Sequence, residues 1–472
     1  MKTLIVILLL SYSCLGQAPS IEWQKSLGGS NSDYSYSIQQ TTDGGYIATG
    51  WSLSNDGDVT GNNGSNDYWV VKLDNNGSVQ WQKSLGGSDE DYSWSVVETI
   101  DGGFAIAGWS KSNDGDVTGN SGFQDYWIVK LDSAGNLEWE KSLGGSDEEY
   151  AFSIQQTMDN GYIIAGWSKS IDGDITGNNG FTDYWVVKLD SVGIILWQKA
   201  LGGSGDDRAW SIQQTTDSGY IIAGSSTSSD GDVTGNNGGF DYWIVKIDSI
   251  GNIEWEKTMG GSDEDEAWSI QQTMDGGYVV AGWTASNDGD VTGSNGYRDS
   301  WIVKLNNLGN IDWQKALGGS SDDRAYSIIQ TNDGGYIVAG GSASIDGDVT
   351  DNNGEFDYWI VKLNNVGSLE WQKSMGGSNQ DIANSIEQTP DGGFIVAGGI
   401  NSGNGDISGY NGSGDFWIVK LGADASLVEL IKADKAPVKI VNLLGQETKD
   451  KPNTTLIYIY SDGTTEKVYR ME

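Results

Sequence analysis

A tryptophan-containing segment recurs every 58 residues along this chain, with no insertion or deletion between copies. Two series of tryptophans keep this step: Trp23, Trp81, Trp139, Trp197, Trp255, Trp313 and Trp371 in W-[QE]-K segments, and Trp69, Trp127, Trp185, Trp243, Trp301, Trp359 and Trp417 in D-Y-W-V-V-K-L and its variants. A fixed period of this length predicts a repeat fold, because one unit cannot bury both of its apolar faces alone and stacks on its neighbours.

Each repeat contains four segments with the composition of β-strands. In the first complete repeat they are Tyr34–Thr41, Gly45–Ser52, Asp67–Asp74 and Val79–Leu85, which we name strands A, B, C and D. Aromatic and β-branched residues fill these segments, and glycine-containing turns separate A from B and C from D. The repeats show neither a 3.6-residue period nor helix-capping residues, so the sequence predicts an almost entirely β fold.

The two ends of the repeat array are complementary. The chain enters at a lone D strand, Ile21–Leu27, and the seventh A-B-C set ends at Leu421, after which Glu429 stands where the next tryptophan would fall. The first strand is therefore expected to complete the last blade and hide its edge. Together these features predict an all-β, seven-bladed β-propeller over residues 17–421, with the B–C and D–A loops on one face of the ring.

The N-terminal residues 1–16 have the pattern of a secretory signal peptide. Lys2 precedes an apolar run, Leu4–Leu10, that is too short for a membrane span of about 20 residues, and no later segment is long enough. Cleavage after Gly16 would leave Gln17 first, whereas a lipoprotein alternative would cut before Cys14. Cys14 is the only cysteine, so the mature chain is expected to contain no disulfide.

The charge balance excludes several classes of function. The formal net charge is −39, and there is no histidine. So acidic a surface repels nucleic acids and anionic lipids and attracts cations. Without histidine there is no Ser-His-Asp triad, no Cys-His pair and no histidine-ligated zinc or copper. A carboxylate-based polysaccharide hydrolase or lyase needs no histidine, so that alternative stays open.

Aspartates recur in and after every B–C loop, two of them in a D-G-D motif and a third at the start of strand C. Two interpretations are open: Asp and Asn side chains that bond their own backbone in turns, and coordination of Ca²⁺ by carboxylate oxygens. The pattern lacks the third acid and the final glutamate of an EF-hand loop. Asn404 replaces the first aspartate in the last repeat, and the candidate calcium ligands are Asp56, Asp58, Asp67, Asp114, Asp116, Asp125, Asp172, Asp174, Asp183, Asp230, Asp232, Asp241, Asp288, Asp290, Asp299, Asp346, Asp348, Asp357, Asp406 and Asp415.

Another acid precedes each strand A, and we predict that it accepts backbone N–H bonds and ties the D–A loop to the neighbouring blade. A catalytic carboxylate pair on this acidic loop face should break the seven-fold pattern. These acids follow it: Asp33, Asp91, Glu149, Asp207, Asp265, Asp323 and Asp381.

The repeated tryptophans are expected to fill the core between blades; they would bind sugar only if exposed. A lysine in each strand C, such as Lys72, should extend its ammonium to solvent or pair with an acid. A few residues depart from the repeat. Arg208 and Arg324 follow the D–A acid in two blades only, Arg298 lies in one B–C loop, and Trp51 becomes Ser225, Gly341 and Gly399 in three blades. The unlike positions of the arginines argue against a sialidase-like arginine triad.

The motifs W-Q-K-S-L-G-G-S, D-G-G-Y-I-x-A-G and D-Y-W-V-V-K-L-D resemble the secreted β-propeller repeats of the SBBP type found in Bacteroidetes, over residues 21–421. The end of the chain, with V-K-I-V-N-L-L-G-Q-E and L-I-Y-I-Y-S-D-G, resembles a type IX secretion C-terminal sorting domain, here residues 422–472. This resemblance implies a small β domain, contact with the type IX machinery, and release outside the cell or attachment to its surface.

The leading hypothesis is a monomeric, non-enzymatic binding or adhesion propeller with a glycan or protein ligand. The rival is the carboxylate-based hydrolase or lyase, with its site on the acidic loop face. The two differ in symmetry, because seven equivalent loops suit a binding array, whereas an active site needs one blade unlike the others.

Overall fold

The computed structural model describes residues 16–423, 439–442, 446–449, 455–459 and 465–469. The predicted signal peptide lies almost entirely outside the described residues. The chain divides into two compact units, Met1–Gly422 and Ala423–Glu472.

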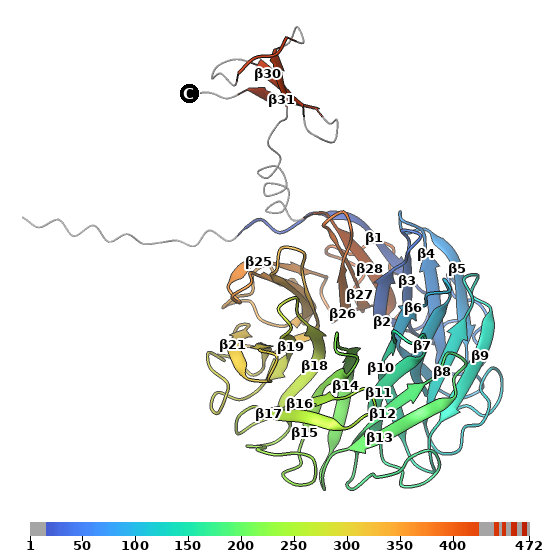
Figure 1. Ribbon diagram of the computed structural model, residues 1–472. Coiled ribbons are helices and arrows are strands. Elements are labelled where there is room, and N and C mark those ends of the chain that lie inside the picture. The colour runs from blue at the N-terminus through green and yellow to red at the C-terminus, as the bar shows by residue number, and fades with distance from the viewer. Residues whose placement is uncertain (1–15, 424–438, 443–445, 450–454, 460–464, 470–472) are drawn as a thin grey trace, which may run out of the picture. The chain divides into compact units, whose positions relative to one another are not determined.

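The first unit contains seven four-stranded antiparallel sheets arranged as a ring, which is a seven-bladed β-propeller (Figure 1). Blade 1 is β2 (Asp33–Gln40), β3 (Tyr46–Ser52), β4 (Asp67–Leu73) and β5 (Val79–Leu85). These bounds agree with the four predicted strands to within one residue at each end. Among the described residues there is no helix, as the sequence predicted.

The other blades repeat this pattern. Blade 2 is β6 (Asp91–Glu98), β7 (Phe104–Ser110), β8 (Asp125–Leu131) and β9 (Leu137–Leu143). Blade 3 is β10 (Glu149–Gln156), β11 (Tyr162–Ser168), β12 (Asp183–Leu189) and β13 (Ile195–Leu201). Blade 4 is β14 (Asp207–Gln214), β15 (Tyr220–Ser226), β16 (Asp241–Ile247) and β17 (Ile253–Met259). Blades 5 and 6 are β18 (Asp265–Gln272), β19 (Tyr278–Thr284), β20 (Asp299–Leu305) and β21 (Ile311–Leu317); and β22 (Asp323–Gln330), β23 (Tyr336–Ser342), β24 (Asp357–Leu363) and β25 (Leu369–Met375).

Blade 7 closes the ring with strands from both ends of the repeat array. Its order is β1 (Ile21–Leu27), β28 (Asp415–Leu421), β27 (Phe394–Ile400) and β26 (Asp381–Gln388). Strand β1 pairs antiparallel with β28, with Leu27 opposite Phe416. The predicted closure is therefore confirmed, and it covers the edge of β28 and completes the last blade.

Aromatic residues join each blade to the next. The Tyr68 ring of β4 lies 4.5 Å from the Trp127 ring of β8, and its hydroxyl donates a 2.8 Å hydrogen bond to the Trp127 carbonyl. Both side chains are fully buried. The same contact recurs around the ring, except that Ser300 and Phe416 replace the tyrosine in blades 5 and 7. The Trp69 series thus fills the inter-blade core, as predicted.

The strand C lysines are buried and paired. Lys72 Nζ lies 2.9 Å from Asp43 Oδ2 in the β2–β3 turn, and it also donates to the Leu73 carbonyl at 3.1 Å. Its side chain is 4% exposed, so the buried ammonium is satisfied at the face opposite the long loops. Equivalent lysine–aspartate ion pairs connect strand C to the A–B turn in each of the other six blades.

In the second unit the described strands are β29 (Lys439–Asn442), β30 (Thr455–Ile459) and β31 (Thr465–Tyr469), which form an antiparallel sheet in that order. Val441, Leu456 and Tyr458 are buried. Within the part of the chain that the structure describes, no helix has the length and apolar character needed to cross a bilayer.

Candidate functional site

The innermost strand of every blade directs its fourth residue toward the central channel. These strands, β2, β6, β10, β14, β18, β22 and β26, each contact the innermost strands of both neighbouring blades. Their fourth residues are spaced by the repeat and are aromatic in six blades: Tyr36, Trp94, Phe152, Trp210, Trp268 and Tyr326, with Asn384 in blade 7.

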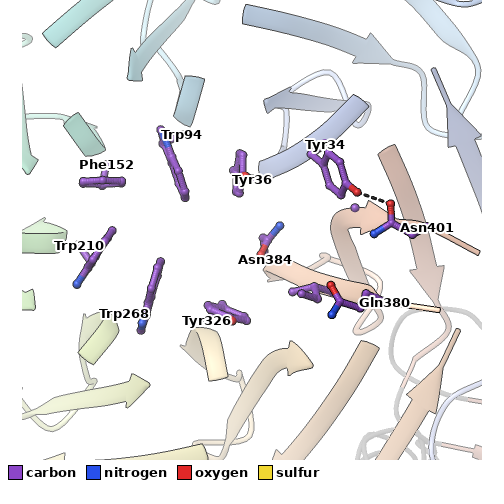
Figure 2. A pocket seen from close by; sticks show the side chains of 12 residues that line it. Tyr34, Tyr36, Trp94, Phe152, Trp210, Trp268, Tyr326, Gln380, Asn384 and Asn401 are labelled. Carbon is purple, nitrogen blue, oxygen red and sulfur yellow. Dashed lines mark hydrogen bonds between the residues drawn. The ribbon is translucent and has the colours of Figure 1, made fainter. Parts of the chain in front are cut away.

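These six side chains form a continuous aromatic arc (Figure 2). Tyr36 stacks on Trp94 with ring centroids 4.0 Å apart, and Trp210 stacks on Trp268 at 4.1 Å. Phe152 links the two pairs, at 4.9 Å from Trp94 and 4.4 Å from Trp210. Tyr326 ends the arc with its ring 5.1 Å from Trp268, nearly perpendicular to it. The arc therefore surrounds the channel except at blade 7.

Blade 7 supplies a polar wall where the arc is open. A cavity of about 340 Å³ lies between the arc and Gln380, Asn384 and Asn401. The Tyr34 hydroxyl and Asn401 Oδ1 share a short hydrogen bond, and Asn384 Nδ2 donates to the Ser35 carbonyl at 2.8 Å. We call this space the channel cavity. Because Gln380 and Asn401 flank the start of β26 and the end of β27, the cavity lies toward the B–C and D–A loop face.

At the cavity, blade 7 lacks a tryptophan that four other blades carry at the same repeat position. Trp51 of blade 1 lies between Tyr34 and Tyr92, at 5.1 and 5.2 Å between centroids. In blade 7 the equivalent residue is Gly399, which lines the cavity. A Cβ on Gly399 would lie 1.9 Å from Tyr34 Cδ1, so glycine is needed for the position of that ring.

Burial also fixes the protonation of the phenols at the cavity. It raises the pKa of Tyr36 to about 12, and it raises the pKa of Tyr326 as well. Both hydroxyls are therefore protonated at neutral pH and can donate hydrogen bonds. Trp51 Nε1 donates to the Tyr36 oxygen at 3.4 Å, which leaves the Tyr36 proton for another acceptor.

Three arginines gather on the loop-side rim in blades 4 to 6. Arg208 and Arg324 share one repeat position in blades 4 and 6, and Arg298 comes from the B–C loop of blade 5. Burial raises the pKa of the Glu266 carboxyl, and the charges of Arg208, Arg298 and Arg324 all oppose that shift, so all three act on one group. Burial raises the pKa of the Tyr326 hydroxyl, and the charge of Arg324 opposes that rise as well.

Each rim arginine is already paired with an acid. Arg324 Nη2 lies 2.7 Å from Asp322 Oδ2, Arg298 Nη2 lies 3.3 Å from Glu264 Oε2, and Arg208 Nη2 lies 3.9 Å from Asp206 Oδ2. The sequence did not indicate that the arginines converge. In this structure each of the three guanidinium groups faces an acid side chain.

A carboxyl group also lies deeper in the channel. Glu387 of β26 stands where four other blades have glutamine, and its Oε2 accepts a 2.9 Å bond from the Gln40 backbone N–H. Burial raises its pKa to about 7. It lines a second space of about 270 Å³ and not the channel cavity.

The candidate calcium ligands hold the loops by hydrogen bonds. In blade 1, Asp56 Oδ1 accepts from the Ser30 N–H at 2.7 Å, and Asp58 Oδ2 accepts from the Gly28 N–H at 3.3 Å. Asp67 Oδ2 accepts from the Asn63 N–H at 2.8 Å. These bonds recur in most blades. The Asp67 bond is local to its own loop, as in the turn interpretation, whereas Asp56 and Asp58 bond the preceding D–A loop, 26 and 30 residues away. Among the residues described, no three His, Cys, Asp or Glu side chains are grouped so that they could hold a metal ion.

The acids that precede strand A accept backbone N–H bonds, as predicted. Asp91 Oδ2 accepts from the Gly87 N–H at 2.8 Å and from Ser112 Oγ at 2.9 Å. The carboxylate therefore joins the D–A loop to the B–C loop of the blade that follows.

Each of these acids approaches a strand C aspartate of the preceding blade. A Cβ on Gly86 would lie 2.4 Å from Asp91 Oδ2 and 2.7 Å from Asp67 Oδ1, so only glycine fits between the two carboxyls. Both aspartates are fully buried, and Asp67 Oδ1 has no hydrogen-bond partner in the described chain. Burial, followed by the charge of Asp91, raises the pKa of Asp67 to about 7; burial raises that of Asp91 to about 6.

The channel cavity was not predicted. Its aromatic series is visible in the sequence with the same 58-residue step as the core tryptophans, and Asn384 breaks that series in one blade. The break is the available indication. To interpret this break as a site, one must know that the fourth residue of strand A faces the channel, and periodicity alone does not reveal that.

No protein-family model matches the chain. The regulatory protein FlaEY of Caulobacter vibrioides is 26% identical over 228 residues, which cover 44% of this chain and 23% of FlaEY. Among solved structures, puromycin hydrolase is similar with a TM-score of 0.49, 9% identity and coverage of 94% of this chain and 62% of that one.

Two further solved structures are similar in the same range. The Pan2 WD40 domain of Neurospora crassa has a TM-score of 0.46 and 9% identity, covering 84% of this chain and 95% of that one. BamB from Moraxella catarrhalis has a TM-score of 0.38 and 13% identity, covering 85% and 88%. The assignment as a β-propeller depends on the seven sheets of the chain itself.

Proposed function

We propose that this chain is a non-enzymatic binding propeller whose ligand enters the channel cavity. The observation that carries the proposal is the break of symmetry at blade 7, where Asn384 replaces the aromatic residue of the other six blades, next to a cavity lined by their aromatic arc and by Gly399. Ligand sites are typically concave, largely apolar, and supplied with a few convergent polar groups. The channel cavity has all three properties.

The lining of the cavity favours binding over hydrolysis. A carboxylate-based glycosidase places two carboxyl groups about 5–10 Å apart on either side of the scissile bond. None of the residues that line the channel cavity is Asp or Glu. Glu266 on the rim and Glu387 deeper in the channel lie outside that lining, and neither belongs to a carboxyl pair across the cavity. We therefore rank the hydrolase or lyase second.

We further propose that the chain is exported, by its N-terminal signal peptide and then by a type IX system that reads residues 422–472, and that it acts outside the cell or on its surface. The sequence motifs support this proposal. Fusing residues 422–472 to a periplasmic reporter in a host with a type IX system should send the reporter to the medium or surface. Retention of the reporter in the periplasm would contradict it.

The binding proposal is tested by probing arrays of immobilised glycans and peptides with the chain and with a Trp268→Ala variant. We expect a set of spots that the wild-type chain binds and the variant loses, in an assay run well below the melting temperatures of both proteins. Release of soluble fragments from a bound polysaccharide would favour the enzyme. Spots bound equally by both proteins would place the site elsewhere on the ring.

A further inference from the structure

The walls of the channel cavity restrict the chemistry of its ligand. This inference rests on the proposed function, and it concerns the class of ligand. The geometry points to a neutral sugar residue, the end or a side branch of an uncharged saccharide, held between the aromatic arc and the amide wall of blade 7.

The first wall provides apolar carbon surface. Tyr36, Trp94, Phe152, Trp210, Trp268 and Tyr326 all line the cavity. Their contacts with one another, at 4.0–5.1 Å between centroids, hold the rings in place before any ligand arrives. Rings fixed in this way lose little conformational entropy on binding. The C–H faces of a sugar ring match such a surface, because their burial removes apolar area from water.

The second wall provides unused hydrogen-bonding groups of both kinds. Asn384 uses Nδ2 to bond Ser35, which leaves Oδ1 as an acceptor. Asn401 uses Oδ1 to bond Tyr34, which leaves Nδ2 as a donor. The Gln380 side chain has no partner within the described chain and is exposed. Sugar hydroxyls both donate and accept, so they can satisfy all three amides.

The absence of charge in the lining argues against ionic ligands. No Lys, Arg, Asp or Glu is among the residues that line the cavity. The rim arginines nearest to it are already paired with acids. An anionic sugar would find no cation among the lining residues, in a chain of formal net charge −39. A cationic ligand would find aromatic rings but no carboxylate in the lining.

The size of the cavity limits how much of a ligand can enter. At about 340 Å³ it lies at the lower end of the range of about 300–1,000 Å³ that is typical of ligand pockets. It accommodates a ring-sized group and excludes a folded element or a helix. A single sugar residue inserted end-on fits this limit, and the rest of the saccharide would lie over the loop face.

Isothermal titration calorimetry with defined probes tests the inference. The neutral probes are cellotetraose, maltotetraose, laminaritetraose and mannotetraose; the ionic probes are tetragalacturonate and choline. We expect at least one neutral probe to bind with one site per chain, and tetragalacturonate and choline to bind at least tenfold more weakly. Asn384→Leu and Gln380→Ala should each weaken binding of that neutral probe by about fivefold, the value of one neutral hydrogen bond.

Glu148→Ala serves as the matched control, because Glu148 occupies in blade 3 the position of Gln380 and does not line the cavity. This variant should bind like the wild type. Tighter binding of tetragalacturonate, choline or an array peptide, still lost in Trp268→Ala, would overturn the neutral sugar and leave the cavity as the binding site. If no probe and no array spot depends on Trp268, both the inference and the proposed function are wrong.

Discussion

Gly399 of blade 7 lies directly against the ring of Tyr34 of blade 1, so close that a Cβ on the glycine would be 1.9 Å from Tyr34 Cδ1. This contact places the Tyr34 hydroxyl on Asn401 and keeps the channel cavity open at one blade of seven. A repeat that is otherwise uniform thereby acquires one distinct site.

Replacing Gly399 by alanine should displace the Tyr34 ring and break its bond to Asn401. Overpacking of this kind costs about 1–3 kcal/mol, so the melting temperature should fall, and array binding should fall with it. Gly341→Ala is the matched control from blade 6, because its Cβ would be no closer than 3.1 Å to any neighbour, the Cδ1 of Phe356. Equal loss of binding in both variants would contradict a special role for the blade 7 glycine.

The buried carboxyl pairs predict that the propeller is more stable in mild acid than in mild base. The pKa is raised to about 7 for Asp67, Asp125 and Asp183 and to about 6 for Asp357 and Asp415, in each case first by burial. When the pKa of a carboxyl is higher in the folded than in the unfolded protein, its contribution to the stability of the fold is greatest below the unfolded pKa of about 4. This contribution is lost as the pH rises through 6–7. Thermal melts should therefore give a lower melting temperature at pH 8 than at pH 5.

Asp67→Asn should reduce this pH dependence, because an amide keeps the acceptor for the Asn63 N–H and carries no charge beside Asp91. Asp43→Asn is the control. Hydrogen bonds to Thr41 and Lys72 outweigh burial and lower the Asp43 pKa to about 2, so its stabilisation is present above pH 4 and is lost only in strong acid. A melting temperature that rises from pH 5 to pH 8 in the wild type would contradict the raised pKa values of the buried carboxyls.

The ion pair of Lys72 and Asp43 should contribute modestly to stability. Asp43 is 55% exposed, so solvent screens the pair, and we expect Asp43→Ala to cost about 1 kcal/mol. Lys72→Ala should cost more, because it also leaves the Leu73 carbonyl without its ammonium donor. Urea denaturation of the two variants measures the difference, and an equal cost would show that the bond to Leu73 contributes little.

Ring closure by the first strand gives a further prediction. Deleting residues 17–28 removes β1 and exposes the edge of β28, so the protein should aggregate and melt at a lower temperature. Truncation after Gly422, the end of the first unit, is the control and should leave the melting temperature of the propeller unchanged. A soluble and equally stable deletion of 17–28 would show that closure is dispensable.

Calcium binding by the D-G-D loops remains a hypothesis with a direct test. The loop carboxylates already accept backbone N–H bonds, and the buried pairs can hold a proton in place of a cation. We therefore expect Ca²⁺ and Mg²⁺ to raise the melting temperature equally, by screening alone. Saturable calorimetric binding of Ca²⁺ that falls in Asp114→Asn/Asp116→Asn would instead establish the loops as metal sites.

The sequence predicted the fold almost completely, because the 58-residue step fixes blade number, strand order and closure at once. The pairing of Ile21–Leu27 with β28 and the burial of Trp69 followed from the same reasoning. For Lys72 the sequence left solvent exposure and an acid partner open, and the structure shows a buried ammonium paired with Asp43. The site did not. Trp94, Trp210 and Trp268 repeat like the core tryptophans, and only three-dimensional placement shows that they face the channel, where Asn384 completes the cavity.

The most direct test of the channel cavity as the binding site uses the chain's lack of other thiols. The only cysteine, Cys14, lies in the predicted signal peptide, so Asn384→Cys in the mature chain places a single thiol in the cavity. Array binding is then measured before and after the thiol is blocked with a bulky maleimide, with Glu148→Cys treated in parallel. The account predicts that labelling at position 384 abolishes binding while labelling at position 148 leaves it intact. Undiminished binding by the chain labelled at position 384 would contradict it.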